Sequence, residues 1–517
     1  MSANQDRYVA VIDIGKTNKK VHIYDESLDL VDGKSMSFES VEREGIPWVP
    51  SDRIESWLLD TLSELNSRYA IELISIATHG ATFACVDAEG ELAIPVVDYT
   101  HEPGDAFHEE FYRLTGSPEE LQRRTATLKL PALLNVAQGV FFFQKTRPDA
   151  FARVKHVLFY PQYLAFRLTG KIGADYTYVA CHTCLFDFSS LDYSFVADAL
   201  DIRDKLPDSI EQPGTVLGRL DPAVAGRTGL SPGVQVTLGV HDSNSSLLPY
   251  LIKKPDENLI VNSTGTWCVA MHPEKRVSFA DEEIGKAVFY NMSALRQPVK
   301  TSILMGGLEF ETYTTLLRER FGMKGLPDFD PNTYRDVVKT AREFILPAVA
   351  RGTGQFPDSA ARVVDHDEVF TLEDVQSGGR AGGRAGGRAP ELFSDTRRAI
   401  AVLNLSLAIQ TITALERVGL GPGVIVYTEG GFRNNRDYNA LLATLAPESS
   451  FRLSGMPEAT SFGAALLGWA AADGRDLMDL GSAFGLEEEK VDGFEIPGLN
   501  AYLEAFWRHL DEARPGS

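Results

Sequence analysis

The sequence predicts an α/β protein of two related lobes, each with a mixed β-sheet flanked by helices and a cleft between them. Residues 8–25 and 259–273 share one design: an apolar strand ends in a small, hydroxyl-rich turn and returns at once as a second strand. The chain of 517 residues is long for one hydrophobic core and suits two domains of roughly 200–250 residues each. We therefore expect the two turns to face one shared cleft.

The composition is that of a globular protein, with 44% hydrophobic and 24% charged residues. A formal net charge of −22 argues against a broad nucleic-acid-binding surface and leaves a small-molecule substrate open. Four cysteines in so long a chain do not form a disulfide framework and fit a reducing compartment. The sequence has neither a signal-peptide pattern nor an apolar run of about 18 residues. We predict a cytoplasmic protein that contacts no membrane and no nucleic acid.

The first half of the chain predicts a sheet that begins with a meander. Strands are expected at residues 8–13 and 21–24, with a third strand soon after. An amphipathic helix follows from about residue 52, because apolar residues recur on one face: Ile54, Trp57, Leu58, Leu62 and Leu65. The next strand ends at His79. Three strands, a helix and a further strand are the order of a mixed sheet with helices on its faces.

The rest of the first lobe, about 105–240, is predicted as helices and loops that end in the apolar strand 234–240. We place the first lobe at residues 1–248 and the second at 249–517. The second lobe is predicted to contain a long helix, a buried strand and a helix of small residues, at 396–419, 424–427 and 460–474. A Gly-Arg repeat without core-forming residues predicts a flexible loop at 377–390.

The first turn, from Asp13 to Asn18, has residues that suit phosphate and magnesium. Backbone N–H groups from Gly15 onward can face phosphate oxygens, Thr17 can donate a hydrogen bond, and Asp13 can hold hydrated Mg²⁺. Lys16 is the lysine best placed to reach a phosphate. The turn is not a Walker A loop, because the GxxxxGK[ST] spacing is absent and no helix follows. An ordinary hairpin turn with a capping aspartate is the alternative.

Two further turns are rich in glycine. Gly265 lets the backbone approach a ligand closely in the second hairpin, where Thr266 adds a hydroxyl. Gly430 and Gly431 follow a buried strand and allow a flat aromatic group to lie against the backbone, with Asn434 available as a hydrogen-bond partner. Each turn alone is weak support for a ligand site, whereas two similar hairpins together favour one.

Polar residues also follow two other apolar strands. Asp242 could accept the proton of a hydroxyl that attacks phosphorus, although for this motif alone an N-cap of the following helix is the favoured explanation. His79 ends its strand where substrate contacts gather in α/β folds, or it is structural. Cys181 and Cys184 have no second Cys or His pair nearby in the sequence, so buried thiols are favoured over a zinc site.

Taken together, these motifs resemble the FGGY family of carbohydrate kinases, whose fold is that of two ribonuclease-H-like lobes as in the actin-like ATPases. The resemblance covers about residues 8–475 and rests on the order of four segments: DIGKTN, GVHDSNS, STGTW and EGGFRNN. It implies transfer of the γ-phosphoryl group of ATP, with Mg²⁺, to a hydroxyl of a small sugar. The GKTN and STGTW variants are most similar to the deoxyketose branch, the fuculose and rhamnulose kinases.

The resemblance also implies roles for individual residues. The first lobe would bind the sugar and carry catalysis, with Asp242 as the general base and Asp13 holding magnesium through water. The nucleotide contacts would come from Gly15, Lys16, Thr17, Asn18, Gly265, Thr266, Gly430, Gly431 and Asn434. Sugar contacts are expected from His79, Asp175 and His241. The Cys181–Cys184 segment would be scaffold, and Lys16 departs from the small or hydroxyl residue usual in the family.

Two other functions stay open. One is a regulatory relative that senses sugar and nucleotide without efficient transfer, which the unusual Lys16 leaves possible. The other is an actin- or chaperone-like ATPase that responds to a protein partner. The sequence is compatible with a homodimer and does not identify the sugar.

Overall fold

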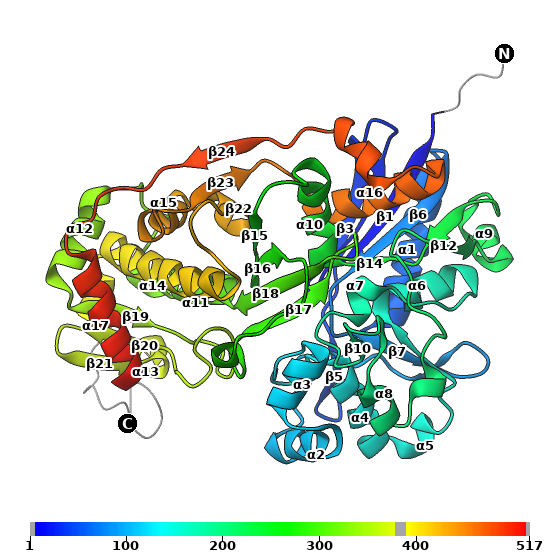
Figure 1. The fold of residues 1–517 in the computed structure, drawn as a ribbon, viewed down its shortest axis with the longest axis horizontal. Coiled ribbons are helices and arrows are strands. Elements are labelled where there is room, and N and C mark those ends of the chain that lie inside the picture. The colour runs from blue at the N-terminus through cyan, green and yellow to red at the C-terminus, as the bar shows by residue number, and fades with distance from the viewer. Residues whose placement is uncertain (1–5, 378–388, 513–517) are drawn as a thin grey trace.

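The computed structural model describes residues 6–377 and 389–512. Most of the predicted Gly-Arg loop lies outside these residues. The fold consists of two α/β halves that meet where α10, from the middle of the chain, packs against α16, from near its C-terminus (Figure 1).

The first sheet has seven strands, and six of them follow the order β12-β13-β6-β1-β2-β3, with β14 paired to β6. The predicted meander is confirmed, because β1, β2 and β3 are successive antiparallel neighbours, and β1 also pairs in parallel with β6. The strands are β1 (Tyr8–Ile14), β2 (Asn18–Tyr24), β3 (Leu30–Ser37), β6 (Ile71–Thr78), β12 (Val216–Arg219), β13 (Gln235–Thr237) and β14 (Val240–His241).

The second sheet also has seven strands, in the order β17-β18-β16-β15-β22-β23-β24. Its centre repeats the first sheet, since β15 forms an antiparallel hairpin with β16 and pairs in parallel with β22. The predicted class of two mixed sheets flanked by helices is therefore confirmed. The strands are β15 (Leu259–Thr264), β16 (Cys268–Pro273), β17 (Val288–Met292), β18 (Pro298–Leu304), β22 (Ile425–Gly430), β23 (Ser450–Ser454) and β24 (Glu488–Val491).

The region predicted as helices and loops also contains short strands. Strand β9 (His156–Phe159) pairs with β7 (Phe83–Val86), more than 70 residues earlier, in a small sheet with β8 (Leu92–Ile94). Turn signals in the sequence reveal local hairpins, and this pairing is not local. The remaining short strands are β4 (Val41–Arg43), β5 (Ile46–Trp48), β10 (Phe186–Asp187), β11 (Asp192–Tyr193), β19 (Glu343–Leu346), β20 (Arg362–Asp365) and β21 (Glu368–Thr371).

Helices pack around both sheets (Figure 1). The predicted helix near residue 52 is α1 (Ser51–Asn66), and four of its five predicted apolar positions are buried. The other helices of the first half are α2 (Asp105–Thr115), α3 (Pro118–Thr125), α4 (Val136–Thr146), α5 (Pro148–Phe151), α6 (Tyr160–Thr169), α7 (Tyr176–Val179), α8 (Phe195–Ala199), α9 (Pro222–Thr228) and α10 (Asp242–Lys253). The second half adds α11 (Gly306–Phe321), α12 (Pro331–Thr340), α13 (Leu372–Ser377), α14 (Thr396–Arg417), α15 (Arg436–Leu445), α16 (Ala459–Asp473) and α17 (Leu499–Glu512).

Helix α16 returns from the second half of the chain to the first sheet. It lies against β1, β6 and α10, and a Cβ on Gly468 would come within 2.7 Å of the Val9 side chain. Only a residue without a side chain lets the helix approach β1 this closely, which explains the small-residue composition of the segment. The division of the chain into two lobes near residue 248 remains a proposal. Helix α16 belongs to the second part of the chain but packs on the sheet of the first part.

Helix α14 is long and apolar enough to cross a membrane by length and composition. However, 89% of its most apolar window is buried inside the protein. A buried apolar helix is what the core of a large α/β half requires, and α14 packs against α11, α12, α15 and β18.

Candidate active site

Parallel strands bring Asp13 and Asp242 to one edge of the first sheet. Asp13 on β1 and Val240 on β14 pair with the same residue, Ala77 of β6, from opposite sides. Because neighbouring strands lie about 4.8 Å apart, the backbones of Asp13 and Val240 are about 10 Å apart. The chain then continues through His241 to Asp242, the first residue of α10. The two carboxylates singled out in the sequence therefore lie at the same sheet edge.

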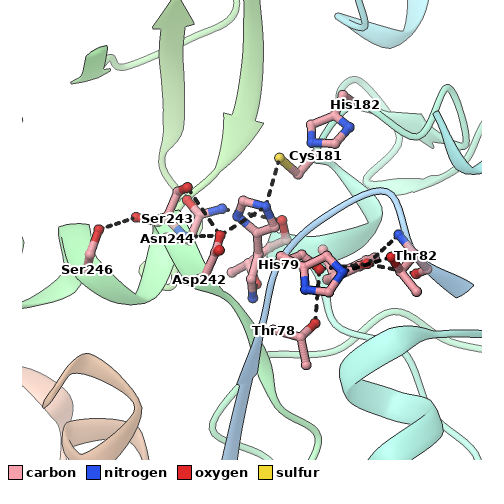
Figure 2. A network of polar contacts seen from close by, with 12 residues as sticks. Thr78, His79, Thr82, Cys181, His182, Asp242, Ser243, Asn244 and Ser246 are labelled. Atoms are coloured by element: carbon pink, nitrogen blue, oxygen red, sulfur yellow. Dashed lines mark hydrogen bonds and ion pairs between the residues drawn. The ribbon is translucent and has the colours of Figure 1, made fainter. Parts of the chain in front are cut away.

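Asp242 lies at the start of α10, where its carboxylate also contacts the helix. Its Oδ1 accepts a hydrogen bond from the Ser243 backbone N–H at 2.6 Å (Figure 2), and the side chain is 30% exposed. Burial raises the pKa of Asp242, while nearby His79 opposes the shift. The helix-cap alternative is wrong, because His241 is the N-cap residue of α10, no side chain caps the helix, and Asp242 is its first residue. The Asp242 side chain also lines a cavity.

This cavity lies between the two halves of the protein. It has a volume of about 140 Å³ and receives side chains from both sheets. The first half contributes His79, Gly80, Ala81, Tyr99, Leu130, Leu134, Cys181, His182, His241, Asp242 and Ser243, and the second half contributes Trp267, Val269, Phe289, Asn291, Thr301 and Ile303. A pocket with a few polar groups at one end and apolar walls elsewhere is the usual form of a small-molecule site.

His79 lines the cavity, but both of its ring nitrogens are engaged. Nδ1 donates to the Ile14 carbonyl at 2.9 Å, which leaves Nε2 to accept from the Thr82 hydroxyl at 2.9 Å (Figure 2). Burial lowers the pKa of His79 to about 4, so the ring is neutral near pH 7. His79 therefore fixes the end of β6 against β1, and a ligand could reach a ring nitrogen only by displacing one of these partners.

His241, His182 and Cys181 form a second group on the cavity wall. His241 Nε2 lies 3.5 Å from Cys181 Sγ and 3.4 Å from Asp242 Oδ1. His182 donates from Nδ1 to the Leu134 carbonyl at 2.9 Å. Burial lowers the pKa of His241 to about 3 and that of His182 to about 4, so both rings are neutral. Cys181 and His182 are visible beside Asp242 in Figure 2.

Asp175, predicted as a sugar contact, lies elsewhere. It is fully buried and caps α7 by accepting from the Thr177 backbone N–H at 2.8 Å, and Gln162 donates to its other oxygen at 2.9 Å. Burial raises its pKa to about 7, against these hydrogen bonds. Because its carboxylate is committed to the cap and does not line the cavity, we no longer propose Asp175 as a substrate contact.

The lysines of the first turn contact groups of the protein itself. Lys16, expected to reach a phosphate, forms an ion pair with Asp98, and its ammonium lies 4.7 Å from the centre of the Tyr99 ring. Lys19 is buried and donates to the carbonyls of Gly15 at 3.0 Å and Lys16 at 2.8 Å. Burial lowers the pKa of Lys19 to about 8. Lys19 thus stabilises the turn by donating to two of its carbonyl groups, whereas the Lys16 ammonium pairs with Asp98.

The tip of the first turn is open. The Gly15 N–H donates to the Asn18 carbonyl at 2.9 Å and closes the hairpin, whereas Thr17 and Asn18 are exposed. The Asn18 side chain accepts a hydrogen bond from the Ser37 hydroxyl at 2.8 Å. Thr17 is the predicted phosphate contact that remains free to meet a ligand at this turn.

The glycine-rich turns of the second sheet are packed together. Thr264 and Gly430 are paired residues on β15 and β22, and a Cβ on Gly430 would lie 2.0 Å from the Thr264 carbonyl oxygen. The Thr264 hydroxyl donates to the Glu429 carbonyl and accepts from the Phe432 N–H at 2.9 Å. Gly430 also has φ near +76°, so no other residue fits there without strain.

The nucleotide residues predicted in the second half are exposed on these turns. They are Gly265, Thr266, Gly430, Gly431 and Asn434. None of them lines the cavity that contains Asp242. The structure therefore brings the five together around β15 and β22 and separates them from the polar end of the cavity.

Two glycines that shape these sites, Gly307 and Gly80, were not identified from the sequence. A Cβ on Gly307, at the start of α11, would lie 1.9 Å from the Gly265 carbonyl oxygen. The Gly306-Gly307 pair after an apolar strand was the available signal. A Cβ on Gly80 would lie 2.8 Å from His182 Nε2, and no local pattern predicts that a histidine 100 residues away fills this space.

The fold and the site define a two-lobed α/β protein with paired glycine-rich turns and a carboxylate that faces a small-molecule cavity. Two family models match the chain. "FGGY family of carbohydrate kinases, N-terminal domain" covers residues 8–249, and "Carbohydrate kinase FGGY, C-terminal domain" covers residues 256–476. The protein therefore belongs to the FGGY family of carbohydrate kinases, and the resemblance predicted from the motifs is confirmed.

Individual relatives are more distant. The chain is 26% identical to an L-fuculokinase of Salmonella typhi over 276 residues, 51% of this chain and 56% of that protein. It is 26% identical to a xylulose kinase of Lactococcus lactis over 295 residues, 55% of this chain and 56% of that protein. The chain thus spans about half the length of these curated relatives. A solved carbohydrate kinase from Novosphingobium aromaticivorans matches over 98% of this chain and 99% of that chain, with 28% identity and a TM-score of 0.76.

Proposed function

We propose that the protein is a kinase that transfers the γ-phosphoryl group of ATP to a hydroxyl of a small sugar, a ketose. The observation that carries this proposal is the position of Asp242, at the sheet edge that it shares with Asp13 and at the polar end of a cavity between the two halves. Family membership supports the reaction class. We further propose that the enzyme works in the cytoplasm.

In this mechanism Asp242 acts on the acceptor. A sugar hydroxyl in the cavity attacks the γ-phosphorus, a new oxygen–phosphorus bond forms, and the bond from that phosphorus to the bridging oxygen of ADP breaks. The hydroxyl proton passes to the Asp242 carboxylate. Burial raises the pKa of Asp242 above that of a free carboxyl group, which makes it a stronger base, and such assistance is worth roughly 10²–10⁴ in rate.

Asp13 has the properties of a residue that holds magnesium through water. Its carboxylate is buried, and no group among the described residues donates a hydrogen bond to it. Burial raises its pKa to about 7; Lys20 opposes this shift and Asp242 adds to it. A divalent cation would favour the ionised form and, when bound, would neutralise negative charge on the phosphates. Both properties fit a site that is completed by a cation.

The nucleotide would lie across both turns. Gly15 and Thr17 on the first turn and Gly265 and Thr266 on the second would lie against the phosphates, with the exposed Thr17 and Thr266 hydroxyls as hydrogen-bond donors. The Gly15 and Gly265 N–H groups donate within their own turns, so these glycines would contribute close backbone approach. The adenine side would be lined by three further exposed residues: Gly430, Gly431 and Asn434. Lys16 is not placed in this set, because Asp98 already neutralises it.

The apolar wall of the cavity supports a deoxyketose as the acceptor. The apolar lining residues are Leu130, Leu134, Val269, Phe289 and Ile303. A sugar with hydroxyls along its whole length would leave some of them against hydrocarbon, which is costly, whereas a terminal methyl group fits such a wall. A methyl group in an apolar pocket is worth roughly 1–3 kcal/mol in discrimination. Polar contacts at the other end would come from His241 and Asp242.

The test is a coupled kinase assay with a panel of ketoses, 6-deoxyketoses and polyols. The proposal predicts ADP formation that depends on the sugar, with a 6-deoxyketose preferred over the matching hydroxylated ketose. ADP formation without any sugar would instead favour an ATPase that serves a protein partner. Sugar-stabilised folding without turnover would favour a sensor. Equal activity on both members of each ketose pair would remove the deoxyketose assignment and leave the kinase assignment intact.

A further inference from the structure

The cavity wall holds a cluster of metal-ligand type that the proposed phosphoryl transfer does not use. Cys181, His182 and His241 each direct one ligand atom to a common region, and the three atoms lie within 4.8 Å of one another. We propose that these three residues bind a thiophilic divalent cation of the zinc class, with a cavity water in the fourth position, and that this cation blocks the sugar site. The inhibitory part rests on the proposed function, whereas the binding part does not.

The distances match tetrahedral coordination. With metal–nitrogen bonds of about 2.0 Å and metal–sulfur bonds of about 2.3 Å, a tetrahedral site separates nitrogen and sulfur ligands by about 3.5 Å. The separation between His241 Nε2 and Cys181 Sγ is 3.5 Å. His241 Nε2 also lies 3.4 Å from Asp242 Oδ1. The pair of His241 and Cys181 would not need to move for a cation to be bound, and Asp242 lies beside His241 outside the three-residue cluster.

The histidine on the CxxC segment is oriented as a ligand. His182 Nδ1 donates its proton to the Leu134 carbonyl, so Nε2 keeps a lone pair that can bind a cation. A backbone or carboxylate partner on the other ring nitrogen is usual for metal-binding histidines. His182 also has φ near +40°, an uncommon conformation for a residue other than glycine, and the backbone holds it there beside the cavity.

Gly80 leaves the space that the cation would occupy. A Cβ at this position would lie 2.8 Å from His182 Nε2 and 2.9 Å from His241 Nε2. Both nitrogens therefore point at one location beside the glycine. His241 Nδ1 is buried without a hydrogen-bond partner among the described residues and Nε2 faces the Asp242 carboxylate, so the neutral ring would carry its proton on Nδ1 when Nε2 binds a cation.

The ligand set selects the kind of cation. Two imidazoles and a thiol suit zinc and similar ions, whereas Mg²⁺ requires oxygen ligands and octahedral geometry. The Mg²⁺ that accompanies ATP would therefore leave this cluster free. On binding, the thiol of Cys181 would release its proton to solvent and coordinate as thiolate. A cation on His241 Nε2, which lies 3.4 Å from Asp242 Oδ1, would favour the ionised carboxylate and lower its ability to accept a proton from the sugar.

Cobalt(II) provides a direct readout, because it adopts the same tetrahedral sites and absorbs light. The reduced full-length protein, freed of metal, is titrated with Co²⁺ in excess Mg²⁺. We expect saturation at one equivalent, with the intense visible bands of tetrahedral cobalt and a near-ultraviolet thiolate-to-cobalt band, and displacement of cobalt by Zn²⁺. Absence of a saturable spectrum would overturn the proposal.

Variants identify the ligands. Cys181→Ser should abolish the thiolate band, and His182→Asn should weaken Co²⁺ binding at least about tenfold, as loss of a ligand requires. Cys184→Ser is the matched control, since this buried thiol of the same CxxC segment contacts Asn135 and does not line the cavity. A thiolate band that is lost in Cys184→Ser but kept in Cys181→Ser would overturn the assignment. Gly80→Ala keeps every ligand and should also lose binding.

Thermal unfolding of each metal-free variant verifies that it is folded. With an active sugar, Zn²⁺ should then inhibit turnover competitively against the sugar and not against ATP. Cobalt binding by a protein that phosphorylates no sugar would remove the proposed function and keep the metal site. Turnover that is unaffected by saturating Zn²⁺ would remove the inhibitory role.

Discussion

The turn after β1 and the turn after β15 occupy equivalent places in two similar sheets, yet their chemistry differs. The first turn follows the buried carboxylate Asp13 and is supported from below by the buried Lys19. The second turn has no charged residue and is held by close backbone packing, with Gly307 and Gly430 against its carbonyl groups. This difference suggests that the first turn supplies charged side chains to the site and that the second turn provides a rigid, neutral surface.

The largest expected effect is a loss of turnover, caused by a change in the first half of the protein, which carries the charged turn. Asp242→Asn keeps the size and the Ser243 contact of the side chain but cannot accept a proton, so turnover should fall by about 10²–10⁴. Binding of ATP, measured by calorimetry, should change little. Ser243→Ala removes a hydroxyl that donates to Asp242 Oδ1 at 3.2 Å but leaves the carboxylate, so it should lose much less turnover. Turnover of Asp242→Asn within a factor of three of the unmodified enzyme would exclude Asp242 as the base.

A second prediction concerns the neutral turn after β15 and the glycine packed against it. Gly430→Ala places a methyl group 2.0 Å from the Thr264 carbonyl oxygen at a positive φ, and we expect a loss of about 2–4 kcal/mol in the free energy of unfolding. Urea denaturation measures this loss. Gly265→Ala is a matched control, because its Cβ would meet only the Trp267 carbonyl oxygen at 3.6 Å. Equal stability of the two variants would contradict the rigid-surface interpretation.

The two halves also differ in how much the sequence could predict. Local patterns predicted both hairpins, and strand ends pointed to Asp13 and Asp242, because the carboxyl ends of parallel strands meet at one edge. The partner of Lys16 could not be predicted, since Asp98 is 82 residues away and reaches it only through the folded sheet. The cluster of Cys181 and His241 is likewise assembled from residues 60 apart.

Asp175 illustrates a different limit. Its carboxylate precedes a short helix, and a cap or a ligand contact would have the same local sequence. Only its full burial and its hydrogen bond from Gln162 distinguish the two roles. Prediction from sequence was therefore better for elements, which depend on periodicity, than for side-chain roles, which depend on distant partners.

A third prediction tests the charge at the first turn through pH. Asp13 has a pKa of about 7 in the folded protein against a normal value of 3.8, so the folded state holds a proton that the unfolded state has lost between these values. The stability of the ligand-free protein should therefore fall as pH rises from 4 to 7, by up to about 4 kcal/mol from this group. Asp13→Asn should remove that part of the decrease and should also lose most turnover.

Asp98 should affect the pH dependence of stability in the opposite direction, which Asp98→Asn tests. Burial would raise the pKa of Asp98, but its contacts with Lys16, Ser40 and Thr100 outweigh burial and lower the pKa to about 2. The ionised carboxylate therefore stabilises the fold at pH values above the normal pKa of aspartate. This stabilisation is lost as the pH falls through about 2. Asp98→Asn should consequently destabilise the protein at pH 7, where Asp13→Asn stabilises it. Thermal unfolding across pH measures both. A pH profile of Asp13→Asn that overlays the unmodified protein would contradict the shift.

The smallest effect is expected at Lys16, where the sequence and the structure give different interpretations. A lysine that binds phosphate would raise the KM for ATP by a large factor when removed, whereas a lysine neutralised by Asp98 and placed over Tyr99 would not. We expect Lys16→Ala to raise the KM for ATP less than about tenfold, since a partly exposed ion pair contributes about 0–1 kcal/mol. Initial-rate kinetics against ATP measure the change, with Lys20→Ala as the control for loss of a neighbouring charge. A rise of a hundredfold confined to Lys16→Ala would mean that this side chain leaves Asp98 when nucleotide binds, and the charged turn would then contact the phosphates through a lysine as well as through its backbone.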